Sequence, residues 1–264
     1  MKLQKALLVF QTNQVSSKSD TPIATINCRT IILTTLIYLI CVLSIPLLQL
    51  DRIIWYGVYP ILMAPLTGIS YTKIFIKSLL VLPFIVFIGI FNPILDHAVA
   101  FHIGSVTVTK GWISFISIII RGLLCMQALI ILISSNSFYR VCESLSYFRV
   151  PKILIIQLLM LYRYSVVLME EAVKMYYSVV SRGYGKSSFP LKMWSKFMGS
   201  LFINTIERSK RIHRAMKARG FDGEIHLGDA PKWKIQDLYF FAIWTLVFLS
   251  LHFINLSQIF FSTL

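Results

Sequence analysis

Long apolar segments alternate with short polar segments along most of this chain. Five of the apolar segments are long enough to cross a bilayer, which takes about 20 residues. They span residues 30–50, 53–69, 74–91, 112–133 and 238–256. Prolines within the first three segments predict kinks that neighbouring helices accommodate. The pattern therefore predicts an all-α, polytopic helical membrane protein with about five transmembrane helices.

The stretch from residue 134 to residue 237 has a different pattern. It holds 17 of the 26 Lys and Arg residues of the chain and eight acidic residues. Because loops rich in Lys and Arg stay on the inner side of a membrane, we expect this stretch to be cytoplasmic. The predicted organisation is a cytoplasmic N-terminal tail (1–29), a four-helix transmembrane region (30–133), the cytoplasmic region (134–237) and a C-terminal transmembrane helix (238–264).

Two long helices are predicted in the cytoplasmic region. The first covers about 151–182, and Pro151 suits its first turn, where the missing N–H costs nothing. The second covers about 191–219 and carries an apolar stripe at helical spacing beside several arginines. Such a basic amphipathic helix suits a membrane surface or a groove on a partner protein.

Composition excludes an ordinary soluble protein. Hydrophobic residues make up 56% of the chain and charged residues 14%, with a formal net charge of +15. Soluble domains have about 25% charged residues. The four cysteines have no C-x-x-C spacing, and Asp96, His97 and His102 fit no standard metal site. We therefore expect neither a metal site nor a cofactor.

Both predicted cytoplasmic helices end in a similar motif of a small residue, Arg, Gly and an aromatic residue. The motifs begin with Ser181, Arg182 and Gly183 and with Ala218, Arg219 and Gly220. One interpretation is a helix C-cap, in which Gly adopts the left-handed conformation and Arg complements the helix dipole. The other is a pair of docking tips, because an Arg beyond a helix end can bind a partner's carboxylate through two parallel hydrogen bonds.

With further motifs in the same order, the sequence resembles a known family. The motifs are Asn27-Cys28-Arg29-Thr30, Phe91-Asn92-Pro93, Tyr162-Arg163-Tyr164, Glu170-Glu171, and Glu207-Arg208 through Met216-Lys217-Ala218-Arg219-Gly220-Phe221-Asp222-Gly223-Glu224. Together they resemble the transmembrane coupling (T) component of energy-coupling factor transporters, especially the cobalt-type subfamily called CbiQ. The chain departs from the family at Asn27-Cys28, where Asp-Pro is usual, and at Ser181, where Ala is usual.

The resemblance implies a non-catalytic scaffold in the inner (plasma) membrane. It implies two ABC ATPase subunits and a separate substrate-binding membrane subunit as partners. Arg182 and Arg219 would bind the ATPases, and the two long helices would be coupling helices. The cobalt-type subfamily implies cobalt or nickel as substrate, with a vitamin-type transporter as the alternative. An intramembrane enzyme is a remote alternative without visible catalytic pairs, and no nucleic-acid module is present.

Overall fold

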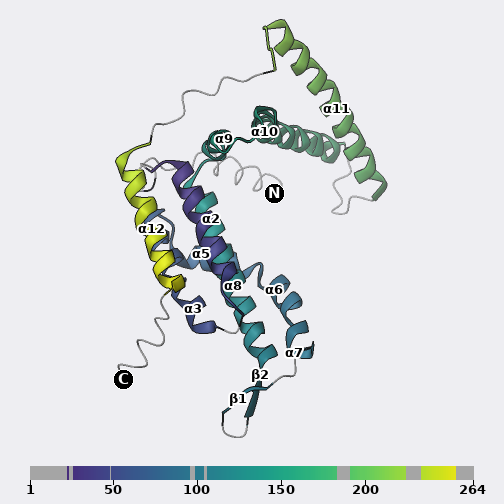
Figure 1. Cartoon of the computed structure of the whole chain (residues 1–264). Coiled ribbons are helices and arrows are strands. Elements are labelled where there is room, and N and C mark those ends of the chain that lie inside the picture. Colours follow the sequence, from purple (N-terminus) through teal and green to yellow (C-terminus); the bar gives the residue numbers. More distant parts are fainter. Residues whose placement is uncertain are drawn as a thin grey trace. The chain divides into compact units, whose positions relative to one another are not determined.

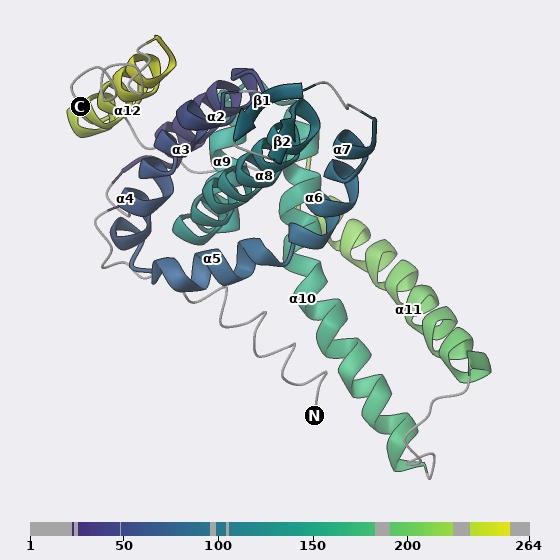
Figure 2. The same ribbon diagram turned by 90° about the horizontal axis from the view of Figure 1, so that it is seen from below.

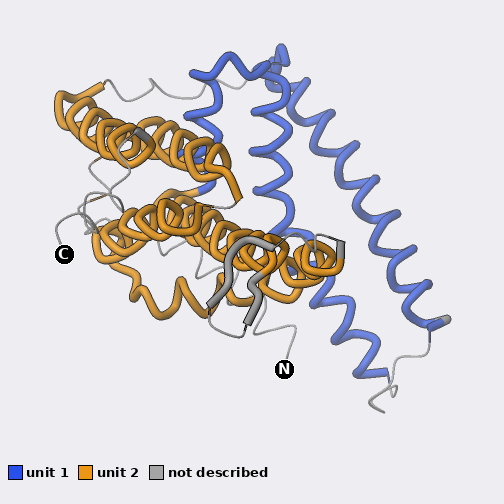
Figure 3. The backbone as a smooth tube through the Cα atoms, turned by 60° about the horizontal axis from the view of Figure 1, so that its bottom comes forward, with its two compact units in different colours: residues 1–17, 138–230 blue, residues 18–137, 231–264 orange. Residues whose placement is uncertain are grey.

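The computed structural model describes residues 23, 26–47, 49–95, 99–103, 106–182, 191–223 and 233–253. The chain divides into two compact units (Figure 3). Unit 1 comprises residues 138–230 with residues 1–17, and unit 2 comprises residues 18–137 with residues 231–264.

The described residues are mainly helical (Figure 1). Unit 1 contains α9 (Phe138–Tyr147), α10 (Lys152–Ser181) and α11 (Leu191–Ala218). Unit 2 contains α2 (Cys28–Ser44), α3 (Leu50–Trp55), α4 (Val58–Leu66), α5 (Tyr71–Leu79), α6 (Leu82–Gly89), α7 (Phe91–Leu95), α8 (Lys110–Ser135) and α12 (Ile235–Phe253). A hairpin of β1 (Val99–Ile103) and β2 (Val106–Thr109) precedes α8, where the sequence predicted only a loop.

Several helices are long and apolar enough to cross a membrane. Among the described residues these are α8, α10 and the Ile235–His252 part of α12. Tyr71–Leu79 and Leu82–Ile94 form a pair bent by 47° that counts as a fourth candidate if it is one span. The predicted polytopic helical membrane fold is confirmed.

Prolines divide the predicted early spans more sharply than the hydropathy pattern indicated. The predicted second span, residues 53–69, is divided into α3 and α4 at Tyr56–Gly57. Pro60 lies four residues after Tyr56. Because proline has no N–H, it cannot donate to the backbone carbonyl of Tyr56, and its ring crowds that carbonyl. Pro83 has the same relation to Leu79, where α5 ends.

The first predicted span is shortened for a related reason. A residue before proline avoids the helical conformation. Ile45 precedes Pro46 and is extended, with φ −70° and ψ 136°. Accordingly α2 ends at Ser44 after 17 residues, rather than continuing to residue 50.

An aromatic cluster lies in the core of unit 2. The rings of Tyr38 in α2 and Tyr59 in α4 stack with centroids 4.5 Å apart, and Trp244 of α12 packs edge-on against Tyr59 at 4.8 Å. The hydroxyl of Tyr38 donates to the carbonyl of Tyr56, and the hydroxyl of Tyr56 donates to that of Phe248. The cluster thus buries large rings while its polar atoms stay bonded, and it joins α12 to the early helices.

Helix α8 contacts α2, α3, α4, α5, α6 and α7, which surround it in Figure 2. Two glycines allow α6 and α8 to approach closely. A Cβ at Gly122 would lie 2.5 Å from Cδ1 of Ile85, and a Cβ at Gly89 would lie 2.9 Å from the ring of Phe115. Small residues allow such backbone approach between membrane helices.

We expect Gly122→Leu to destabilise the protein by about 1–3 kcal/mol, since the added side chain overpacks the contact with Ile85. Thermal unfolding of the detergent-solubilised protein measures this. Gly199→Ala is the control, because no heavy atom of the described residues lies within 4 Å of a Cβ there. Replacing a helical Gly by Ala should stabilise α11 by up to about 1 kcal/mol. An unchanged melting temperature for Gly122→Leu would contradict the close packing.

Candidate functional site: the ends and faces of the two long helices

The end of α11 is a Schellman motif. Gly220 has φ +80°, a left-handed conformation that favours glycine. The N–H of Phe221 donates to the carbonyl of Met216, and the N–H of Gly220 donates to that of Lys217, both at 3.0 Å. These two bonds define the motif and satisfy carbonyls that the helix end leaves free. The C-cap predicted at Gly220 is confirmed.

The end of α10 lies at Ser181, and Arg182 is its C-cap residue, with φ −80° and ψ 18°. The N–H of Arg182 donates to the carbonyl of Val179 at 3.3 Å, which tightens the last turn. Gly183, the third residue of this motif, lies outside the described residues. The helix therefore ends where the motif predicts, with Arg182 directly after its last residue.

The two arginines share one environment. Arg182 and Arg219 each follow the last residue of a long helix, and both are exposed, as are Ser181 and Ala218. Within the described part of the chain, neither guanidinium forms an ion pair. A guanidinium in this position has its donors available for a carboxylate on another protein.

A groove of about 410 Å³ lies between α10 and α11 within unit 1. Its lining is mainly apolar and continues to the end of α11, where Met216 and Phe221 contribute. The other lining residues are Ile153, Ile156, Gln157, Met160, Tyr164, Leu168, Thr205, Arg208, Ser209, Ile212, His213 and Gly223. The end of α11 that presents Arg219 is thus adjacent to an apolar groove.

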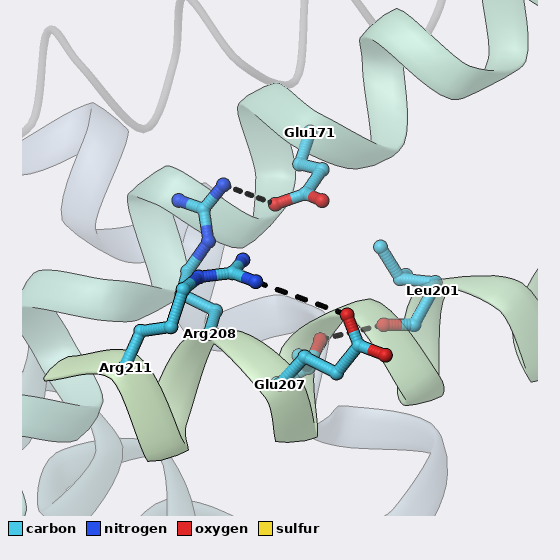
Figure 4. A network of polar contacts seen from close by, with 6 residues as sticks. Glu171, Leu201, Glu207, Arg208 and Arg211 are labelled. Carbon is cyan, nitrogen blue, oxygen red and sulfur yellow. Dashed lines mark hydrogen bonds and ion pairs between the residues drawn. The ribbon is translucent and has the colours of Figure 1, made fainter. Parts of the chain in front are cut away.

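An ion pair connects α10 to α11 (Figure 4). Nη2 of Arg208 lies 2.7 Å from Oε2 of Glu171, and the two side chains are partly exposed, at 35% and 20%. On α11 itself, Nη1 of Arg211 lies 3.8 Å from Oε2 of Glu207, an i, i+4 pair. The interhelical pair was missed, because the sequence does not reveal which way a glutamate on one helix faces relative to another helix.

Helix α9 packs against α10 through aromatic and small residues. The ring of Phe138 stacks on that of Tyr162 with centroids 4.4 Å apart. Cys142 of α9 is buried, and this burial raises the pKa of its thiol. Since the neutral thiol is then favoured, Cys142 is a packing residue rather than a nucleophile.

The Asn27 motif lies in unit 2, at the start of α2. Both carboxylate oxygens of the fully buried Asp237 accept hydrogen bonds. Oδ1 accepts the N–H of Asn27 at 2.9 Å, and Oδ2 accepts the N–H of Lys234 at 2.8 Å and the side-chain amide of Asn27. The contact joins the N-terminal ends of α2 and α12. An amide at position 27 can donate to this carboxylate, whereas the Asp usual in the family could not do so when ionised.

Arg121 of α8 has backbone carbonyls as its partners. Its guanidinium donates to the carbonyl of Ile45 at 2.5 Å and to that of Leu43 at 3.4 Å. These carbonyls are free because α2 ends at Ser44. Backbone carbonyls at the end of α2 thus accept hydrogen bonds from two of the three guanidinium nitrogens.

Metal-ligating residues do not gather in the described ranges. No group of three or more His, Cys, Asp or Glu side chains there could hold a metal ion. His102 lies in β1, opposite Thr107 in the hairpin, and Asp96 and His97 lie outside the described residues. His213 lines the groove together with the basic Arg208, a poor setting for a cation ligand.

The described structure defines a helical membrane protein in which one unit presents two exposed arginine tips. A family model described as "Cobalt transport protein" (CbiQ) matches residues 20–227, and the chain belongs to this family. The chain is also 28% identical over 134 residues to an uncharacterized protein, MJ1571, of Methanocaldococcus jannaschii. That match covers 50% of this chain and 46% of the relative, so the chain spans about half the length of this curated relative.

Proposed function

We propose that this chain is the transmembrane coupling component of an energy-coupling factor transporter. In this role it joins two ABC ATPase subunits to a separate substrate-binding membrane subunit, and other chains bind ATP and substrate. The observation that carries the proposal is the pair of exposed arginines at the ends of α10 and α11. Two similar tips suit a partner assembly that offers two similar grooves.

The proposal places α10 on the cytoplasmic side, although its length and hydropathy would also allow it to cross a membrane. Arg163, Glu170, Glu171 and Lys174 lie in its central and C-terminal parts. Each charge at the centre of a bilayer costs about 2.5–3.5 kcal/mol even on insertion scales. The ion pair of Glu171 with Arg208 also requires α11 beside this part of α10, and α11 is rich in basic residues.

The geometry supports a mechanical rather than a catalytic role. Arg182 and Arg219 bind the ATPases, and closure of the ATPases around ATP moves the ends of both helices. The ion pair between Glu171 and Arg208 and the shared groove couple α10 to α11. The movement reaches the substrate-binding subunit through exposed apolar side chains on these helices, such as Leu161 and Phe202. ATP hydrolysis thereby drives uptake without a reaction on this chain.

The substrate we propose is a transition-metal ion, cobalt or nickel, in keeping with the description of the family. A vitamin-type transporter is the second candidate, because the substrate is bound by another subunit. Uptake of labelled cobalt, nickel and vitamins by cells carrying the complete complex distinguishes them.

Co-purification tests the coupling role. The tagged full chain, co-expressed with ATPases and a substrate-binding subunit from the same genome, should retain two ATPase polypeptides and one substrate-binding subunit per chain. Purification of the chain without ATPases, from membranes that contain all the subunits, would contradict the proposal.

A further inference from the structure

On the side away from α10, α11 carries a set of exposed cations. Docking by Arg182 and Arg219, which we call the coupling tips, does not explain them. Between residues 207 and 219 the chain has six basic residues and one acidic residue. Four of them, which we call the basic face, are exposed on α11: Lys210, Arg211, Arg214 and Lys217. The spacing of Lys210, Arg214 and Lys217 is i, i+4, i+7, so they lie along one side of the helix.

The groove lies on the other side of the same helix. Thr205, Ser209, Ile212 and Met216 line it and follow a separate i, i+4, i+7, i+11 stripe. At about 100° per residue, this stripe is roughly 160° away from the basic face. Within unit 1 the basic face therefore points away from α10.

Most of this charge has no counter-ion on the same chain. In the part of the chain that the structure describes, Lys210, Arg214 and Lys217 form no ion pair. Arg211 has Glu207 at 3.8 Å, but both side chains are more than 60% exposed and such a pair is weak. Like charges at i, i+3 and i, i+4 spacing cost a helix a few tenths of a kcal/mol each. The basic face thus destabilises α11 in isolation, and an acidic partner would relieve the repulsion.

The chemistry of α11 favours an acidic soluble protein over a lipid surface as that partner. A helix lying in a membrane interface buries its apolar side, and its cations reach the headgroups from the flanks of that side. Four of the exposed large apolar residues of α11, Leu191, Trp194, Met198 and Phe202, are on the groove side, whereas Ile203, 58% accessible, lies on the side of the basic face and N-terminal to it. When the apolar side meets lipid or an apolar partner, the basic face points to water.

We propose that the basic face of α11 steers an acidic surface of the ATPase subunits toward the coupling tips. This inference rests on the proposed function, because it takes the ATPases as the partner. Exposed charges act over about 10 Å at moderate salt, and they change the rate of encounter more than the lifetime of a complex. Arg182 and Arg219 hold the docked ATPases, whereas the basic face accelerates their arrival.

The test uses the full chain in lipid nanodiscs and measures the association and dissociation rates of the ATPases at about 50 mM and about 300 mM salt. Neutralising the basic face (Lys210→Gln, Arg211→Gln, Arg214→Gln and Lys217→Gln) should lower the association rate about tenfold at low salt and flatten its salt dependence. The dissociation rate should change less than about threefold. Two double variants that lose the same net charge provide the control. One is Arg214→Gln with Lys217→Gln on the basic face, and the other is Arg163→Gln with Lys174→Gln on α10. Only the first pair should slow association.

An unchanged association rate and salt slope in the four-site variant, with binding intact, would overturn the steering role and leave the coupling role in place. Absence of ATPase binding by the unaltered chain would instead mean that the coupling role itself has failed. A last comparison uses nanodiscs of phosphatidylcholine alone and nanodiscs that also contain phosphatidylglycerol, an anionic lipid. If the variant loses only its preference for the anionic lipid while ATPase binding is unaffected, the basic face binds lipid and the inference is wrong.

Discussion

Replacement of Arg182 and Arg219 together by Glu should abolish association of the chain with the ATPase subunits. Each change removes the donors for a partner carboxylate and puts a negative charge in their place. Loss of one partner of a buried, hydrogen-bonded charge pair costs about 2–5 kcal/mol. Two sites therefore lower affinity by about a thousandfold or more. Pull-down of the ATPases by the tagged full chain in detergent measures the loss.

Single variants and a matched control make this prediction specific. Arg219→Glu alone should weaken association strongly, whereas Arg163→Glu makes the same change of charge at an exposed position on α10 and should leave it nearly intact. Thermal unfolding of each variant shows whether the fold is retained. Full recovery of the ATPases by the double variant would count against docking at the helix ends.

Replacement of Asp237 by Ala should destabilise unit 2 by about 3 kcal/mol or more. The carboxylate accepts the backbone N–H groups of Asn27 and Lys234 and the side-chain amide of Asn27. Each buried donor that loses its partner costs about 1–3 kcal/mol. The contact joins the starts of α2 and α12, so we expect α12 to separate first. Thermal unfolding in detergent, followed by Trp fluorescence, reports this because Trp244 lies in the aromatic cluster.

Exchange of the two side chains provides the control for this prediction. Asn27→Asp alone should destabilise the protein, because it places two carboxylates against each other. The double variant Asn27→Asp with Asp237→Asn places one carboxylate and one amide together again and should recover part of the loss, because the amide at position 237 has one acceptor oxygen for the two backbone N–H groups. A melting temperature of Asp237→Ala within about 1 °C of the unaltered protein would show that the contact contributes little.

Hydropathy predicts the class of fold well, and proline explains where the prediction of individual helices is wrong. The apolar runs identify α8 and α12 as candidate spans with nearly correct ends. The same runs do not show that Pro60 and Pro83 each interrupt a helix four residues earlier. They also do not predict the β1–β2 hairpin, whose short strands lie in what the sequence showed only as a connecting loop.

For the candidate site, the sequence predicts positions along the chain but not their orientation. The repeated Arg-Gly motif predicts both helix ends, because glycine and helix capping are local properties. Glu171 with Arg208 and Asn27 with Asp237 are separated by 37 and 210 residues. Neither pair follows from periodicity, because a single sequence does not show which faces of distant helices meet. The charge of α11, in contrast, is evident from composition, and the structure adds the direction of its basic face.

Photo-crosslinking at the two helix ends tests the central claim most directly. A benzophenone-bearing amino acid at Ser181 or Ala218 leaves both arginines in place and lies directly beside them. In membranes that contain the complete complex, both positions should crosslink to ATPase subunits. The same group at Trp112, which is exposed at the opposite, outer end of the candidate span α8, should not do so. Absence of ATPase adducts from both ends, when ATPases crosslink elsewhere on the chain, would contradict the account.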